Sequence, residues 1–191
     1  MFFLQQVFSW CFSSPPVGCA QYFTGSSGTI TSFNYGTNDD YHHLADQLYT
    51  VCIRREEKYC QIGYHPSNNG NSFYLSFNPG SGGGTFKARA GEIGCIADFI
   101  SIPRGRNSLQ TGGLGCLTAT NPSNPTAVSV ETLNRFCGQR LNCVSTSSES
   151  SWIYSDLLPF QISVELNGAE PTGNGDNKNR GFSLDYLQVP C

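Results

Sequence analysis

The segment CIADFISIPRG, residues 95–105, places one carboxylate among apolar side chains. A strand turns alternate side chains to the same face. Three isoleucines share the face of Asp98: Ile96, Ile100 and Ile102. The sequence therefore predicts a strand whose buried face carries Asp98 near one end. Because burial of an ionised carboxylate is costly, Asp98 must be hydrogen-bonded, paired with a cation or bound to a metal ion.

Other residues that can do chemistry form no recognisable catalytic pattern. Adjacent side chains in a strand point to opposite faces, so His42 and His43 cannot both bind one metal ion from regular backbone. We interpret these two and His65, the remaining histidine, as solvated loop residues. No G-x-S-x-G nucleophile motif is present. The stretches GSGGGT and GNGD do not link a strand to a helix, as phosphate-binding loops do.

Short segments with strand character, separated by clusters of Gly, Asn, Pro and Ser, dominate the chain. The predicted strands cover 28–35, 48–54, 60–65, 72–77, 95–102, 159–166 and 181–189. Helical periodicity extends over one turn at most, within 41–52. This pattern predicts an all-β, antiparallel two-sheet β-sandwich. Two long loop insertions are expected, at 78–92 and 106–134.

The composition fits one domain with a substantial core. Of the 191 residues, 38% are apolar and 13% aromatic, whereas only 13% are charged, about half the usual share. The net charge is −3, and no run of basic residues exceeds Arg54-Arg55. A nucleic-acid-binding surface needs a basic stripe, so this class is excluded. No apolar run approaches the ~18 residues of a membrane span.

Nine cysteines are the strongest compositional signal. No C-x-x-C pair occurs, which argues against a zinc site, and wide spacing in a chain of low charge indicates disulfides and an extracellular setting. We expect a local bridge between Cys116 and Cys143. Because the count is odd, we expect Cys11 to be free or intermolecular. Cys11 lies in an apolar segment that has neither the basic start nor the cleavage site of a secretory signal. We interpret residues 1–18 as an N-terminal extension, either a signal remnant or the tail of a preceding domain.

Several motifs, taken in order, resemble those of the CUB domain family over about residues 19–191. The matching pieces are Cys19, GTITSFNYG (28–36), LYTVCIR (48–54), CQIGY (60–64), CIADFISI (95–102), RFCG (135–138) and NRGFSLDY (179–186). Phe33 and Gly36 stand at two family prolines, and Tyr49 takes the place of a family tryptophan. The ending Gln188–Cys191 is similar to that of an extended, cysteine-rich variety in invertebrate secreted proteins.

This resemblance implies a CUB-like jelly-roll sandwich and a role in recognition rather than catalysis. It also implies a disulfide between Cys95 and Cys137. The second family bridge would join Cys19 to Cys52 and leave Cys60 with Cys191. The alternative is a bridge between Cys52 and Cys60 across one hairpin, which would leave Cys19 with Cys191. The sequence leaves both pairings open.

The resemblance further implies a calcium ligand at Asp98. At the other family positions, Glu92 is a displaced candidate, Asn167 stands where an aspartate would be, and Glu170 follows it. Calcium takes six to eight oxygen ligands, and this set is incomplete. We therefore expect no cofactor, with calcium as the alternative. Without calcium, Asp98 would accept hydrogen bonds from turn N–H groups or from the hydroxyl of Tyr35 or Tyr41.

The predicted function is a non-catalytic, extracellular binding module that recognises a protein or a glycan. The candidate contact residues are Arg104, Arg106 and Tyr41, and the candidate loops are 36–43, 103–107 and 167–180. Trp152 and Tyr154 are expected on a sheet face or in the core, although such residues also serve as interface anchors. The alternatives are a matrix component crosslinked through Cys11 and, less favoured, a secreted hydrolase.

Overall fold

The structure is a computed structural model that describes residues 15–37, 42–70, 72–75, 87–107, 116–119, 128–144, 147–168 and 179–191. Their strands are β1 (Cys19–Phe23), β2 (Ser27–Thr31), β3 (Gln47–Ile53), β4 (Tyr59–Pro66), β5 (Phe73–Tyr74), β6 (Ala88–Ala90), β7 (Phe99–Gly105), β8 (Cys116–Ala119), β9 (Val128–Glu131), β10 (Leu133–Gly138), β11 (Ile153–Ser155), β12 (Gln161–Leu166) and β13 (Gly181–Pro190). One short helix, α1 (Ser67–Gly70), follows β4. Among the described residues, no helix is long and apolar enough to cross a membrane.

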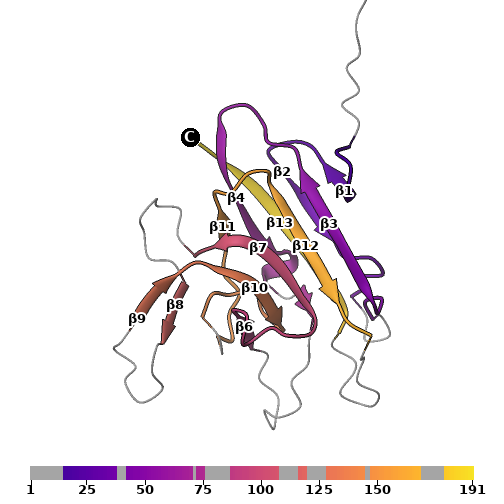
Figure 1. The fold of residues 1–191 in the computed structure, drawn as a ribbon, viewed down its shortest axis with the longest axis vertical. Coiled ribbons are helices and arrows are strands. Elements are labelled where there is room, and N and C mark those ends of the chain that lie inside the picture. The colour runs from indigo at the N-terminus through magenta and orange to yellow at the C-terminus, as the bar shows by residue number, and fades with distance from the viewer. Residues whose placement is uncertain are drawn as a thin grey trace, which may run out of the picture.

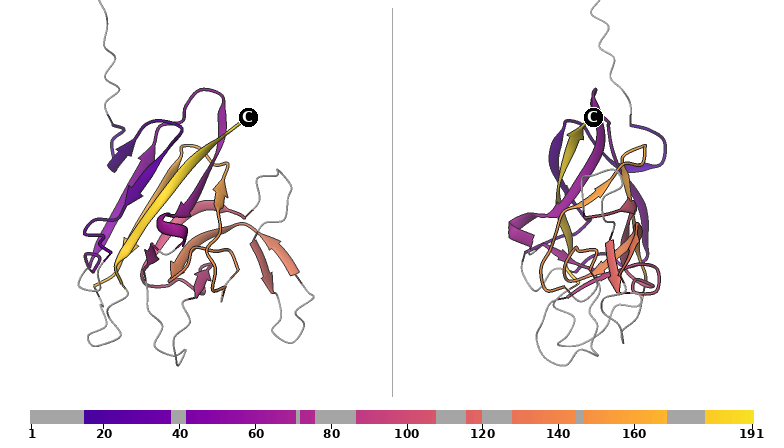
Figure 2. Two further views of the ribbon diagram at one scale, coloured as in Figure 1. Left: turned by 180° about the vertical axis from the view of Figure 1, so that it is seen from behind. Right: turned by 90° about the vertical axis from the view of Figure 1, so that its left-hand side faces the viewer.

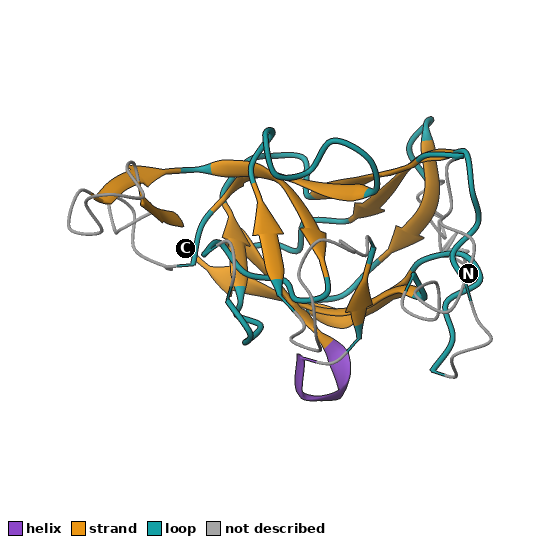
Figure 3. Cartoon of the chain, turned by 90° about the horizontal axis from the view of Figure 1, so that it is seen from below, coloured by secondary structure: helices purple, strands orange, loops and turns teal. Residues whose placement is uncertain are grey.

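The strands form two main sheets that lie as layers (Figure 3). The first contains six strands in the order β1-β3-β12-β7-β10-β6, and the second contains β11-β4-β13-β2, with β5 also paired to β13. The β8–β9 hairpin projects from one side of this sandwich (Figure 1). The predicted all-β two-sheet sandwich is confirmed. One strand pair departs from the antiparallel pattern, because β1 runs parallel to β3.

The core lies between the two sheets and follows the alternation of the sequence. Along β12, Ile162 and Val164 are completely buried while Glu165 is exposed. Along β13, Phe182 and Leu184 are also completely buried. Each such side chain stabilises the fold by about 1.5–3 kcal/mol through burial. The period of two therefore predicts the inner face of these strands correctly.

The strand predicted over 95–102 begins only at Phe99. The preceding residues form a turn, in which the Cys95 N–H donates to the Gly91 carbonyl at 3.0 Å. As a result Ile96 is 81% exposed, and its predicted place on the buried face is wrong. The one short helix of the described residues is α1 rather than a turn within 41–52, and it forms where the sequence predicts a turn cluster.

The two predicted insertions contain strands of their own. The first contributes β6, which pairs with β10 at the edge of the six-stranded sheet. The second contains the β8–β9 hairpin and the start of β10. A buried disulfide between Cys116 and Cys143 joins β8 to the segment after β10. The excursion is thus anchored to the sandwich at its base.

Three further disulfides link segments that are distant in the sequence. Their partners are Cys19 with Cys52, Cys60 with Cys191, and Cys95 with Cys137. Of the two pairings that the sequence leaves open, the structure has the one without a bridge across the hairpin. Cys11 lies outside the described residues, as does most of the predicted extension over 1–18, so both remain predictions.

Candidate recognition site at the Asp98 end

Asp98 lies at one end of the sandwich, just before β7. The described parts of three connections meet there, because β3 begins, β12 ends and β7 begins at this end of the six-stranded sheet. We call this region, with Asp98, Asn167 and Asp46 at its centre, the Asp98 end. In Figure 2, β13, drawn in yellow, runs from this end of the molecule to the C-terminus.

The Asp98 carboxylate joins two of these connections. It is only 4% exposed, and its Oδ1 accepts a hydrogen bond from the Asn167 N–H at 2.8 Å. The Asn167 carbonyl in turn accepts from the Asp46 N–H at 3.1 Å. The Asp46 carboxylate packs closely against Gly168, where an added Cβ would lie 2.6 Å from its Oδ1. The end of β12 is therefore held between Asp98 and Asp46.

Of the residues that the resemblance implies as calcium ligands, Asp98 and Asn167 lie together, joined by the hydrogen bond between the Asn167 N–H and the Asp98 carboxylate. Glu92 is exposed on the β6–β7 connection, and Glu170 lies outside the described residues. No group of three or more His, Cys, Asp or Glu side chains suited to a metal ion occurs among the residues that the structure describes.

The β2–β3 connection is tied to the start of β13 by hydrogen bonds. The His43 N–H donates to the Asn179 carbonyl at 2.8 Å, and the Arg180 guanidinium donates to the Thr37 carbonyl at 2.7 Å. His43 is 3% exposed, so its interpretation as a solvated loop residue is wrong. Burial raises the pKa of Tyr35, partly offset by the charge of Arg180 and a hydrogen bond with Ser72. Tyr41 lies outside the described residues.

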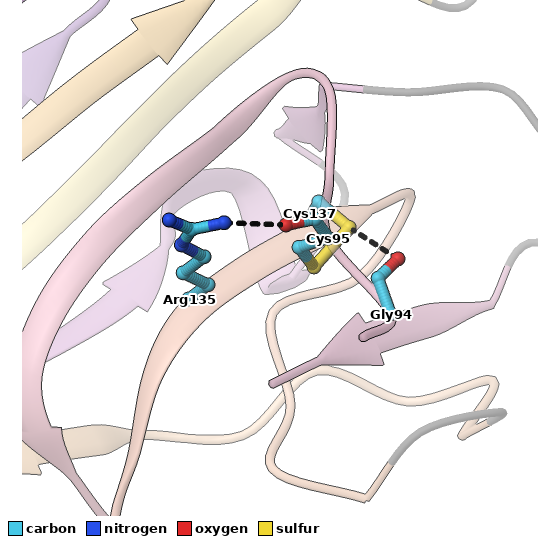
Figure 4. Close-up of a disulfide and its surroundings, with 4 residues drawn as sticks. All are labelled: Gly94, Cys95, Arg135 and Cys137. Atoms are coloured by element: carbon cyan, nitrogen blue, oxygen red, sulfur yellow. Dashed lines mark hydrogen bonds between the residues drawn. A yellow bond between two sulfur atoms is a disulfide. The ribbon is translucent and has the colours of Figure 1, made fainter. Parts of the chain in front are cut away.

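A loop with two exposed isoleucines, held by a disulfide, precedes β7. Ile93 is 98% exposed and Ile96 81% exposed, while Cys95 between them is buried. Figure 4 shows the disulfide that joins Cys95 to Cys137, with Cys137 Sγ 3.5 Å from the Gly94 carbonyl oxygen. The Arg135 guanidinium donates to the Cys95 carbonyl at 3.4 Å. We call residues 91–98 the isoleucine loop.

Beneath this loop lies a small satellite core on the outer face of the six-stranded sheet. It consists of the disulfide between Cys95 and Cys137 and the ring of Phe99. The Arg135 guanidinium covers that ring at 4.3 Å from its centroid. A cation over an aromatic face is attractive by about 0.5–2 kcal/mol. The isoleucine loop is therefore held both by its disulfide and by the packing of that disulfide against Phe99.

Arg104 and Arg106 lie at the opposite end of β7 from Asp98. At the usual rise per residue, the part of β7 that separates Asp98 from Arg104 spans about 20 Å. Arg106 is buried, and it donates to Asp156 at 2.8 Å. Arg104 is more exposed and lies 3.5 Å from the same carboxylate. The candidate loop 103–107 is thus separated from the described parts of 36–43 and 167–180, which lie at the Asp98 end.

A pocket of about 510 Å³ lies near the edge formed by β1 and β3. Its lining includes the disulfide between Cys19 and Cys52, together with Phe160, Arg54 and Arg55. No carboxylate or imidazole lines this pocket. Acid–base catalysis needs such groups converging in a cleft, and this pocket does not provide them.

Sequence reasoning missed the isoleucine loop because alternation assigned Ile96 to a buried face. The signal that could have found it is the pair of glycines around Ile93, since glycines mark turns. Gly91 indeed has φ +86°, a conformation that few other residues adopt without strain. The exposure of Leu48, on the outer face of β3, was not predicted either.

The family model of the animal CUB domain matches residues 16–189 of the chain. The search of curated proteins found no match. Among solved structures, the CUB1-EGF-CUB2 domain of human MASP-1/3 is similar, with 17% identity and a TM-score of 0.43 over 90% of this chain and 42% of that one. The CUB1-EGF-CUB2 domains of rat MASP-1 show 20% identity and a TM-score of 0.42 over 89% and 40%.

The MASP-1 CUB2 domain bound to Ca²⁺ is 19% identical, with a TM-score of 0.39 over 88% of this chain and 98% of that one. The chain spans less than half the length of the first two structures. The family match, by contrast, extends over nearly the whole sequence, from before β1 to the last strand. By this match the protein belongs to the animal CUB domain family.

Proposed function

We propose that this protein is a non-catalytic, extracellular recognition module that binds a protein partner through the isoleucine loop. CUB domains are generally extracellular protein-interaction modules. Four disulfides among the described cysteines accord with an oxidising compartment.

The exposure of Ile93 and Ile96 carries the proposal. Two large aliphatic side chains exposed to 98% and 81% are unusual on a loop that is so firmly held. The disulfide of Cys95 and the hydrogen bond from Arg135 fix the backbone between them. A rigid apolar projection loses little conformational entropy when a partner covers it. Such a loop suits a hydrophobic contact at the centre of a protein interface.

A catalytic role finds less support. The pocket beside β1 has Arg54 and Arg55 as its charged residues and no carboxylate or imidazole in its lining. Arg54 is already engaged by Glu56, at 2.9 Å. The side chains that would transfer protons in a hydrolase therefore do not line this pocket.

The test is partner capture from the extracellular fluid of the secreting tissue, with the wild-type protein and a variant that carries Ile93→Ser and Ile96→Ser. We expect the variant to lose the partner by at least tenfold, because both apolar contacts are removed. A variant with Leu157→Ser, an exposed leucine near Asp156 at the far end, is the matched control and should retain it. Equal capture by all three proteins would refute the isoleucine loop as the contact surface.

For Asp98 we propose a structural role, in which its carboxylate ties β7 to the end of β12 without calcium. Asp98→Ala leaves the N–H of Asn167 without its acceptor, so we expect a loss of about 1–3 kcal/mol in the free energy of unfolding. The loss should be the same with and without added calcium. Calorimetric titration of calcium into wild type and variant checks this, and binding heat that disappears in Asp98→Ala would contradict it.

A further inference from the structure

The outer face of the five-stranded sheet carries a row of side chains that the proposed function does not use. The register places Asp185 of β13 between His65 of β4 and Thr29 of β2. Trp152 precedes β11, whose Ile153 is paired with Tyr64, so Trp152 lies beside His65. We call Trp152, His65, Asp185 and Thr29 the cross-sheet row. Their neighbours on the inner face, such as Ile153 and Tyr64, are completely buried.

Three aromatic rings at one end of the row have similar orientations. The rings of His65 and Trp152 have centroids 5.2 Å apart and planes inclined by 30°. The rings of Trp152 and Tyr154 have centroids 6.1 Å apart and planes inclined by 18°. Each of the three side chains is half-buried, neither sealed in the core nor fully exposed. Together they form an ordered aromatic surface, and the exposed Leu187, the register partner of Gly63, lies on the same sheet face.

Gly63 allows these rings to lie close to the backbone of β4. A Cβ at Gly63 would lie 2.6 Å from Tyr154 Cε1 and 3.0 Å from Trp152 Cε3. Any other residue would therefore push both rings away from the sheet. A glycine inside a strand weakens it, and often marks a place where another group approaches closely. The ring positions thus depend on this one residue.

The polar groups around the rings are held by hydrogen bonds, but some of their acceptor oxygens have no hydrogen-bond partner within the described chain. Asp185 Oδ1 accepts hydrogen bonds from Thr29 Oγ1 at 2.7 Å and Ser67 Oγ at 2.8 Å. Its second oxygen has no hydrogen-bond partner in the described part of the chain. The buried side-chain oxygen of Gln61 also has no hydrogen-bond partner among the described residues. Gln61 lies two residues before Gly63 on the same strand. An unpaired buried acceptor is costly unless a ligand or water satisfies it.

We propose that the cross-sheet row, together with Tyr154, binds a neutral sugar ring of a glycan. A pyranose has a face of C–H groups that stacks on an aromatic ring, and hydroxyls at its rim that need acceptors and donors. Trp152 and Tyr154 offer the aromatic surface, and the second oxygen of Asp185 accepts from hydroxyls. No lysine or arginine belongs to this set, and the Asp185 charge repels a sulfated or carboxylated sugar.

Fluorescence of a single tryptophan provides the direct test. The chain has two tryptophans, Trp10 and Trp152, so in a Trp10→Phe background the emission reports on Trp152 alone. The probes are an array of neutral oligosaccharides of glucose, galactose, mannose and N-acetylglucosamine, with sulfated and sialylated counterparts. We expect binding to neutral glycans, followed by a saturable change in emission when the best of them is titrated.

Variants separate the role of each group. By calorimetry, Trp152→Ala should weaken binding at least tenfold, whereas Trp152→Phe keeps a ring and should lose much less. Asp185→Asn should weaken binding about fivefold or more through the lost carboxylate. Gly63→Ala displaces both rings and should also weaken binding. Thr31→Ala, an exposed residue of β2 on the same face but outside the row, is the matched control and should bind as the wild type.

Four outcomes would overturn the proposal. The first three are no binding to any neutral glycan, a preference for sulfated or sialylated glycans, and binding that survives Trp152→Ala. The fourth is capture of a protein that depends on Trp152, which would reject the sugar as the ligand. The variant with Ile93→Ser and Ile96→Ser should bind the glycan normally, so failure here is distinguishable from failure of the isoleucine loop.

Discussion

Arg106 and Asp156 form an ion pair that is largely closed to solvent. The Arg106 side chain is 5% exposed and that of Asp156 17%, and Arg106 Nη1 lies 2.8 Å from Asp156 Oδ2. Burial favours the neutral form of Asp156, but the hydrogen bond and charge of Arg106, with the charge of Arg104, outweigh it and lower the pKa of Asp156 below 3.8. The pair joins β7 to the segment after β11.

The lowered pKa of Asp156 predicts a pH-dependent contribution to stability. Because the folded pKa lies below the unfolded value, the contribution is present above about pH 4 and is lost as the pH falls through the folded pKa. Asp156→Asn should therefore cost about 2–3 kcal/mol at pH 7, and its difference from wild type should shrink as the pH falls through the folded pKa of Asp156. Urea unfolding across this range measures it, with the exposed Glu165→Gln as control. A difference that does not change with pH would contradict the assignment to Asp156.

At the scale of elements, Gly28 of β2 leaves room for the ring of Tyr186 on the neighbouring strand β13. Their Cα atoms are register partners, and a Cβ at Gly28 would lie 2.7 Å from Tyr186 Cε1. The Tyr186 ring is 2% exposed, and its hydroxyl donates to the Thr24 carbonyl at 3.2 Å. The glycine thus makes room for a buried ring rather than for a turn.

Gly28→Ala should destabilise the protein by about 1–3 kcal/mol, since the added methyl group forces the Tyr186 ring to shift. The exposed neighbour Ser27→Ala should have little effect. In a Tyr186→Leu background, Gly28→Ala should cost much less, because the ring that it strikes is gone. A double-mutant cycle by denaturant unfolding measures this coupling. Additive effects would show that the strain lies elsewhere.

At the scale of the whole molecule, the disulfides differ most in the length of chain that they close. The bridge between Cys60 and Cys191 spans 131 residues and ties the end of β13 to β4. The bridge between Cys19 and Cys52 spans 33 residues at the edge of the other sheet. A longer closed loop removes more entropy from the unfolded chain.

Replacing each of these pairs with serines should therefore give unequal losses. We expect each loss to fall within about 2–5 kcal/mol, with the pair of Cys60 and Cys191 costing about 1 kcal/mol more, from the ratio of loop lengths. Both pairs include partly exposed cysteines, so cavity effects are similar. Urea unfolding of the two double variants tests the order. The reverse order would show that native-state contacts outweigh loop closure.

Local pattern in the sequence determined the sandwich and most of its core. The alternation around Ile162 and Phe182 specifies an inner face whatever strand lies alongside. The alternation assigned Ile96 to the wrong face, because a turn held by the Cys95 disulfide interrupts the strand there. Local pattern also placed Arg106 in a surface loop. The neighbouring residues give no sign that Arg106 is buried in an ion pair with Asp156, 50 residues away.

By itself, then, the sequence determined the fold class and the presence of disulfides, because composition and period act residue by residue. Only the tertiary structure decided how Cys19, Cys52, Cys60 and Cys191 pair, and that Asp98 and Arg106 lie at opposite ends of one strand. It alone aligned Trp152, His65 and Asp185 across three strands. These arrangements depend on pairing between distant segments, and such contacts form only after long loops have closed.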